Sequence, residues 1–182
     1  MKQVSTPVRV ARPARHARPR TAELPEFESM DNAHRAALQM LESFHRLLKQ
    51  LDSTGLDDSA RNSAREILAF FNGPGRHHHE DEEKHVFPGL LAEGKPELVK
   101  HIHRLMQDHG WLEEDWRELS PQVEAIADGY NWYDMAMLTA ALPVFTALYH
   151  EHIALEESMV YPAAKRQRQA LLDGKAERTT PN

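Results

Sequence analysis

Apolar side chains recur at helical spacing along most of this chain, and that periodicity limits the fold more than any other feature. Steps that alternate between four and three residues run through residues 29–51 and again through residues 96–119. Short breakers such as Ser-Thr-Gly at 53–55 separate the segments, and no convincing alternation of polar and apolar residues predicts a strand. We therefore predict an all-α protein that folds as an antiparallel up-and-down four-helix bundle.

The other two helices follow from the same pattern and from the positions of glycine and proline. The second helix is predicted over residues 57–94, and Gly-Pro-Gly at 73–75 should kink or split it. Residues 120–129 predict a looser connection that holds a short helix at most. The fourth helix is predicted over residues 132–168, with a bend at Pro143.

Basic residues are concentrated at the start of the chain. The first 22 residues carry six Lys or Arg and no acid, whereas the net charge of the whole chain is −6, so the remainder is near −12. We predict a disordered Arg/Pro-rich tail at residues 1–27, a bundle at 28–168 and a C-terminal tail at 169–182. Such an Arg-rich start also resembles a transit peptide, but a flexible tail on a cytoplasmic protein is favoured.

Composition and missing motifs exclude several classes of function. The chain has no cysteine, which excludes disulfides, thiolate zinc sites, iron–sulfur clusters and cysteine nucleophiles. Neither the G-x-S-x-G nucleophile motif nor the H-E-x-x-H zinc motif occurs. No long apolar run predicts a membrane span, and the acidic body predicts no nucleic-acid binding beyond nonspecific contacts of the tail. The 12 histidines are a high number that still needs an explanation.

Titratable residues lie on the apolar stripes of the predicted helices. His34, His109, His152 and Glu156 each fall in phase with neighbouring core positions. A single buried histidine is usually a hydrogen-bonded core residue, but a buried carboxylate is costly unless it is paired or binds a metal ion. Because several predicted helices each place a histidine on their inward face, one metal site shared by these helices explains the pattern better.

Two segments of the chain repeat one pattern. Residues 78–88 and residues 152–162 both read His, three residues, Glu-Glu, two residues, Val, an aromatic residue and Pro. The histidine and the first glutamate are four residues apart, so both side chains lie on one helix face. An imidazole and a carboxylate in that position can reach one metal ion, and a carboxylate can bridge two ions through its two oxygens.

The level of each histidine in the bundle narrows the candidates. Distances along the chain from the two predicted turns place His34, His78 and His109 at one level, whereas His45 and His101 fall near the bundle ends. The predicted metal ligands are His34, His78, Glu82, His109, His152 and Glu156. Imidazoles combined with carboxylates fit a pair of iron ions best, and zinc stays an alternative.

Four short motifs, "DNAHRAAL", "HHEDEEKHVFP", "MQDHGWL" and "HIALEESMVYP", resemble those of the hemerythrin-like (HHE cation-binding) family over residues 28–167. The resemblance implies a non-heme di-iron centre with an oxo or hydroxo bridge, held by the six residues above. It also implies a ligand such as oxygen, nitric oxide or peroxide. Oxygen-carrying members place a further histidine where this chain has Leu105, which favours one histidine-poorer iron with an open position. Sensing, scavenging or iron handling is favoured over simple oxygen carriage, and a ligand-binding protein over a dedicated enzyme.

Several alternatives stay open at this point. Glu83 or Glu157 can replace the glutamate before it as a ligand, and His79 can replace His78, because neighbours are 100° apart around a helix. A ferritin-like site needs two Glu-x-x-His motifs, and the chain supplies one, at Glu82. The main alternative function is a metal-free structural or partner-binding helical bundle. The sequence does not indicate the oligomeric state.

Overall fold

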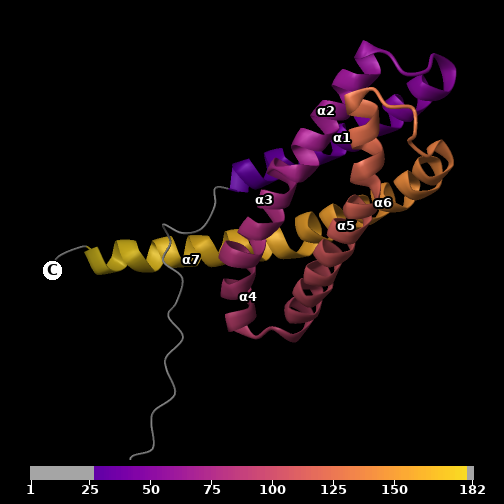
Figure 1. Cartoon of the computed structure of the whole chain (residues 1–182). Helices are drawn as coiled ribbons and strands as arrows, with labels where there is room; N and C mark the ends of the chain where they lie inside the picture. The colour runs from indigo at the N-terminus through magenta and orange to yellow at the C-terminus, as the bar shows by residue number, and fades with distance from the viewer. Residues whose placement is uncertain (1–26, 180–182) are drawn as a thin grey trace, which may run out of the picture.

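A computed structural model of the chain describes residues 27–179, with side chains up to residue 173 (Figure 1). The helices are α1 (Phe27–Ser53), α2 (Asp58–Asn72), α3 (Pro74–Asp81), η2 (Glu82–Val86), α4 (Phe87–Glu93), α5 (Pro96–Asp128), α6 (Met135–Leu155), η3 (Glu156–Val160) and α7 (Tyr161–Thr179). The elements η2 and η3 are π-helical turns. Residues 27–179 contain no strand, which confirms the all-α prediction. None of their helices is both long and apolar enough to cross a membrane.

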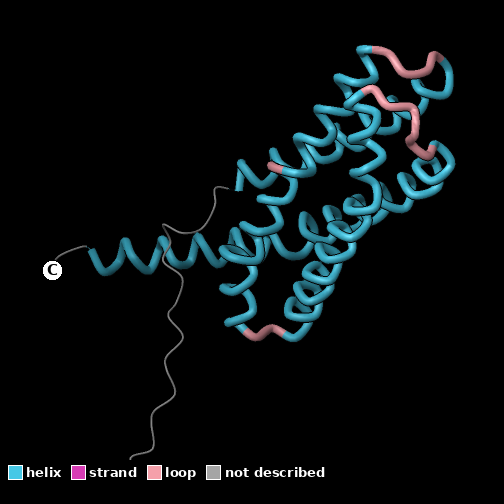
Figure 2. The backbone as a smooth tube through the Cα atoms, viewed as in Figure 1, coloured by secondary structure: helices cyan, strands magenta, loops and turns pink. Residues whose placement is uncertain are grey.

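The helices form a bundle of four helical segments. The first segment is α1, the second runs from α2 to α4, the third is α5 and the fourth runs from α6 to α7. Helix α2 packs against α1 and α5, and α6 packs against the same two helices. Figure 2 shows that short loops join the segments at their ends. The antiparallel up-and-down order of the segments stays a prediction.

Local sequence accounts for most of the helix ends. The side chain of Asp57 accepts a hydrogen bond of 2.7 Å from the backbone N–H of Ala60 and so caps α2. Gly94 and Gly129 follow α4 and α5 with φ values of 68° and 85°. A residue with a side chain would be strained there, which explains glycine at both ends. The predicted split of the second segment occurs at Gly73, between α2 and α3.

The third and fourth segments differ from the sequence prediction. Helix α5 continues through Pro121 to Asp128, so the looser connection predicted at 120–129 is wrong. Proline removes one backbone donor, but Val123 and Ile126 are fully buried beyond it, and their packing outweighs that loss. Helix α7 ends at Thr179, which is later than the predicted helix end at Arg168. Of the predicted tail at 1–27, residues 1–26 lie outside the described residues, and Phe27 is the first residue of α1.

The buried apolar residues of the bundle form two clusters. The larger cluster includes Phe44, Ile67, Leu112 and Phe145 from α1, α2, α5 and α6. The smaller cluster is built from the first residues of α1, from η2 and α4, from the first part of α5, and from η3 and α7. Its largest members are Phe27, Phe87, Leu90, Ile102, Leu105 and Tyr161. Along α5, Leu105 belongs to the smaller cluster and Leu112 to the larger one, which places residue 109 between the two.

Candidate metal centre

The structure brings the six predicted residues together between the two apolar clusters. Each of the four helical segments contributes at least one of them. They are His34 from α1, His78 from α3, Glu82 from η2, His109 from α5, His152 from α6 and Glu156 from η3. The side chain of His78 is 9% exposed, and the other five residues are at most 6% exposed. Their convergence agrees with the sequence argument, and their role as metal ligands stays a prediction.

Glu82 lies between two histidines and directs one oxygen toward each. Its Oε1 is 3.8 Å from Nε2 of His78, and its Oε2 is 3.5 Å from Nε2 of His109. The two imidazoles come from different helical segments, α3 and α5. A carboxylate in this position can bridge two cations, one for each oxygen.

Glu156 repeats this arrangement from the other side of the centre. Its Oε2 is 3.0 Å from Nε2 of His34, and its Oε1 is 3.2 Å from Nε2 of His152. The ligand-type atoms therefore form two overlapping groups. One contains His34, His78 and both glutamates; the other contains His109, His152 and the same glutamates. We call the positions inside these groups position 1 and position 2.

His79 also lies in the centre, whereas the sequence argument offered it only as an alternative to His78. Its ring stacks on that of His109 with centroids 4.2 Å apart, and it lies 5.3 Å from the ring of His152. The three imidazoles place nitrogen atoms within 4.8 Å of one another, so His79 adds a third imidazole at position 2. The two adjacent histidines of α3 are thus not alternatives, because each faces a different position.

The second glutamate of each motif lies outside the cluster. Glu83 is 2.9 Å from Nδ1 of His109, and Glu157 is 3.1 Å from Nδ1 of His34. The geometry therefore does not favour Glu83 or Glu157 as a replacement for the glutamate before it. Each carboxylate accepts a hydrogen bond from Nδ1–H, which leaves Nε2 of that histidine free to face the centre.

Unpaired polar atoms test whether this donor set fits metal ions. Nine buried side-chain nitrogen and oxygen atoms within the described residues lack a hydrogen-bond partner, and all lie in or beside this centre. They include Nε2 of His78, His109 and His152, and both oxygens of Glu156. Buried polar atoms are normally paired, so such a concentration is unusual. Six of the nine atoms face positions 1 and 2, where cations would satisfy them. The other three are Nδ1 of His152 and the two oxygens of Asp108, with Nδ1 and Oδ2 4.0 Å apart.

The histidines of the centre have pKa values shifted in two directions. Burial lowers the pKa of both His78 and His152 to about 4, so each offers a neutral imidazole near pH 7. Burial acts on His34 and His109 as well, but hydrogen bonds and charges of the adjacent glutamates outweigh it and raise their pKa above 6.5. In the metal-free protein, the second pair therefore keeps its protons to a higher pH than a free imidazole does, and metal binding competes with those protons.

The two central glutamates also differ from each other. Burial and the charge of Glu82 raise the pKa of Glu156 well above its usual value. Burial acts on Glu82 in the same direction, but the nearby imidazoles of His109 and His78 outweigh this and lower its pKa. Two buried carboxylates this close cannot both ionise without nearby positive charge. A pair of cations would supply that charge and let both bind as carboxylates.

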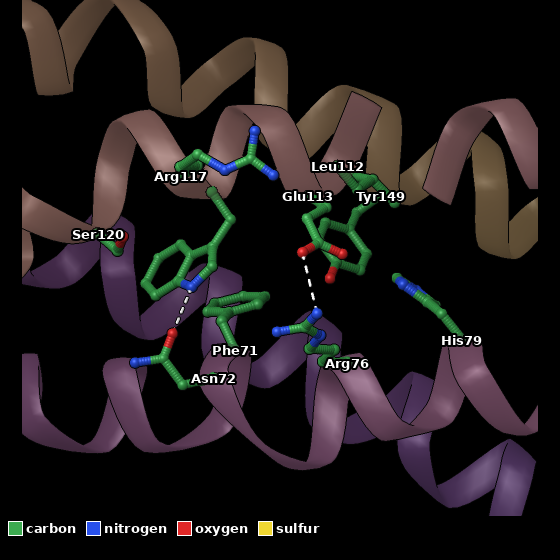
Figure 3. Close-up of a pocket in the computed structure, with 10 residues that line it drawn as sticks. Phe71, Asn72, Arg76, His79, Leu112, Glu113, Arg117, Ser120 and Tyr149 are labelled. Atoms are coloured by element: carbon green, nitrogen blue, oxygen red, sulfur yellow. Dashed lines mark hydrogen bonds and ion pairs between the residues drawn. The ribbon is translucent and has the colours of Figure 1, made fainter. Parts of the chain in front are cut away.

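A cavity of about 300 Å³ leads from the surface to His79. Its walls include the buried aromatic residues Phe71, Trp116 and Tyr149. In Figure 3, the ring of His79 points toward the cavity, and an ion pair of 3.2 Å between Arg76 and Glu113 lies beside it. A small molecule can therefore approach position 2 through this cavity, with His79 as the last side chain on the way.

The bundle and its cluster of five imidazoles and two carboxylates define a helical protein with a buried site of the kind that holds metal ions. The family model described as "Hemerythrin HHE cation binding domain" matches residues 26–164. The chain thus belongs to the hemerythrin HHE cation-binding domain family.

An uncharacterized protein of Haemophilus influenzae (strain Rd) is similar over part of the chain. It is 33% identical over 110 residues, which is 60% of this chain. The match covers 61% of the relative's length. No solved structure matches the chain significantly.

Proposed function

We propose that this protein is a non-heme di-iron protein that binds oxygen, nitric oxide or peroxide, in sensing, scavenging or iron handling. The arrangement of the two central glutamates carries the proposal. Glu82 and Glu156 each direct one oxygen to position 1 and the other to position 2. Membership in a family described as cation-binding supports the same reading.

The donor set favours iron over zinc. His34 and His78 would hold the ion at position 1, the three other imidazoles would hold the ion at position 2, and the glutamates would bridge them. Zinc in protein sites usually takes four ligands, whereas position 2 offers three imidazoles and two carboxylate oxygens. Mixed nitrogen and oxygen donors in larger number suit iron better.

Iron at this centre would supply the redox chemistry and the affinity for small ligands, and the protein supplies the surroundings. Glu83 and Glu157 orient His109 and His34 through their Nδ1–H groups. The two apolar clusters exclude water from both ends of the centre. The cavity at His79 offers a route for a ligand with a few atoms.

The metal-free structural bundle is less well supported. Such a protein would bury two carboxylates and five imidazoles and leave seven of their polar atoms without a hydrogen-bond partner. Replacing buried ionic groups with apolar residues is often neutral or stabilising by about 1–4 kcal/mol, so a purely structural bundle gains nothing from them.

Metal analysis of full-length protein from iron-fed cells tests the proposal. We expect about two irons per chain, as in other two-metal sites, with near-ultraviolet absorption that is lost in His78→Ala and in Glu82→Ala. His77→Ala is the matched control, because His77 is exposed beside the centre. Metal-free wild-type protein with full helicity and stability would contradict the proposal. Zinc instead of iron would keep the site and remove the redox function.

A further inference from the structure

The two repeated motifs place an aromatic ring at equivalent points, but one ring carries a hydroxyl. Phe87 stacks on His109 with centroids 5.8 Å apart and planes at 16°. Tyr161 stacks on His34 with centroids 5.1 Å apart and planes at 9°. Both residues are 1% exposed, so the hydroxyl of Tyr161 lies inside the protein. At this pair of equivalent residues, the two motifs therefore differ by one buried oxygen atom.

That oxygen faces position 1. It lies 2.6 Å from Oε1 of Glu82 and 3.1 Å from Nε2 of His34. Both of these atoms belong to the group around position 1. Metal–ligand bonds of about 2.0–2.2 Å at right angles separate neighbouring ligand atoms by about 3 Å. The distances from the hydroxyl oxygen to Glu82 and His34 are thus close to those expected between two ligand atoms of one metal ion.

The supply of donors at the two positions supports the same role. Position 2 has a donor from His79, the residue after the first histidine of its motif. The equivalent residue in the other motif is Ile153, which is apolar and packs in the larger cluster. Without a further donor, four residues would hold an ion at position 1, whereas the two groups that share His109 and His152 would together supply five residues at position 2. The hydroxyl of Tyr161 would make the two numbers equal.

We propose that Tyr161 is the fifth protein ligand of the ion at position 1. This inference rests on the proposed di-iron function. Coordination forms one bond between the phenol oxygen and iron(III), releases the phenol proton to solvent, and changes no oxidation state. It fills the coordination position next to His34, so a small ligand that reaches position 1 must displace the tyrosine oxygen or bind beside it.

Spectroscopy of the full-length protein loaded with iron(III) tests this ligand. We expect a visible tyrosinate-to-iron charge-transfer band, and phenolate ring vibrations in the resonance Raman spectrum that shift when the protein contains ring-deuterated tyrosine. Tyr161→Phe should lose both signals and keep helicity, because it restores the aromatic residue of the other motif. Tyr149→Phe is the matched control, since Tyr149 is also buried but no hydrogen bond joins it to the centre.

The outcomes separate this inference from the proposed function. Iron bound at about two per chain without the deuterium-sensitive vibrations would overturn the ligand role of Tyr161 and leave the di-iron function standing. Failure to bind iron at all would overturn both. If Tyr161→Phe does not fold, the wild-type protein and Tyr149→Phe still give an answer. A deuterium-sensitive phenolate vibration that is present in both proteins shows that iron binds a tyrosine other than Tyr149.

Discussion

The two motifs at residues 78–88 and 152–162 build the two halves of the centre in nearly the same way. In each, a histidine lies in the last turn of an α-helix and a glutamate begins a π-helical turn. The next glutamate binds Nδ1 of a histidine on α5 or α1. The motifs differ at two inward positions, where His79 stands against Ile153 and Phe87 against Tyr161. The repetition places similar side chains around positions 1 and 2, and these two differences give the positions different polar groups.

The π-helical turns explain how one motif supplies both a ligand and a ring against the centre. Each turn starts at the bridging glutamate, Glu82 or Glu156, and covers five residues. A π-helical turn holds one more residue than an α-helical turn, so the residues beyond it are rotated by about 100° relative to a continuous α-helix. The aromatic residue five positions after the glutamate therefore returns to the inward face, where it stacks on a histidine.

The largest effect should come from breaking the bridges. In both Glu82→Gln and Glu156→Gln, we expect loss of both ions, with affinity reduced by at least about 100-fold, because each carboxylate serves both positions. Metal content per chain measures this directly. Glu80→Gln is the matched control, since Glu80 is exposed in the same motif and pairs with Arg76. If either bridging variant keeps one full ion per chain, that glutamate does not bridge.

Removing His79 should separate the two positions. In His79→Leu, we expect iron to fall from about two per chain to about one, because position 2 loses an imidazole and position 1 keeps all of its ligands. Titration of the metal-free variant with iron(II) under anaerobic conditions measures the remaining stoichiometry. His77→Leu controls for a change at the neighbouring exposed position. Equal loss at both positions would show that His79 acts on the whole centre.

These two predictions differ in how far the sequence alone supports them. Glu82 and Glu156 could be predicted, because i,i+4 spacing and repeated motifs are local patterns that follow from helix geometry. His79 was predicted only as an alternative to His78, because adjacent residues on an ideal α-helix do not share a face. His79 lies in the centre because positions 1 and 2 are side by side, so that His78 faces position 1 and His79 faces position 2. The Glu83 contact with His109 was not predicted either, because distances along the chain place neighbouring helices level only to within about one turn.

The same distinction holds for the fold. Apolar periodicity predicted the helices, and Gly73 split the second segment as expected. The continuation of α5 through Pro121 was missed, since proline alone favours a helix end. The burial of Val123 and Ile126 against neighbouring helices outweighs that preference, and this packing is a tertiary effect. The π-helical turns were missed because a periodicity of 3.6 residues was assumed throughout.

A smaller effect is expected from the outer glutamates. Glu83→Gln and Glu157→Gln should each weaken iron binding by about 10–100-fold, because each orients one histidine through its Nδ1–H group. Glu83→Gln should act first at position 2 and Glu157→Gln at position 1, since they contact His109 and His34. Competition with a chelator measures the two affinities. Equal weakening of both ions in each variant would contradict a separate outer carboxylate for each position.

The smallest effect concerns the stability of the metal-free protein as pH changes. His78 and His152 have pKa values of about 4 when folded and near 6.5 when unfolded, so the free energy of unfolding falls as pH drops from 6.5 to 4. The raised pKa of His34 and His109 stabilises the fold below pH 6.5, and this contribution is lost as pH rises through their folded pKa values. The raised pKa of Glu156 has the opposite effect and increases the free energy of unfolding as pH drops. It is one group against the two histidines His78 and His152, so the loss of stability on the acid side remains.

We therefore expect the metal-free protein to be most stable near pH 6.5, with slopes of about 1.4 kcal/mol per pH unit for each titrating group. Urea denaturation followed by circular dichroism at a series of pH values measures this dependence. A free energy of unfolding that rises steadily from pH 6.5 to pH 9 would contradict the assignment of protons to His34 and His109.

The central claim is that two ions lie between the apolar clusters and share Glu82 and Glu156. Anomalous X-ray scattering at the iron absorption edge, from crystals of protein purified from iron-fed cells, tests it most directly. We predict two peaks about 3.5–4 Å apart, one beside His34 and His78 and the other beside His79, His109 and His152. A single peak, peaks outside this cluster, or no peak from well-folded crystals would contradict the account.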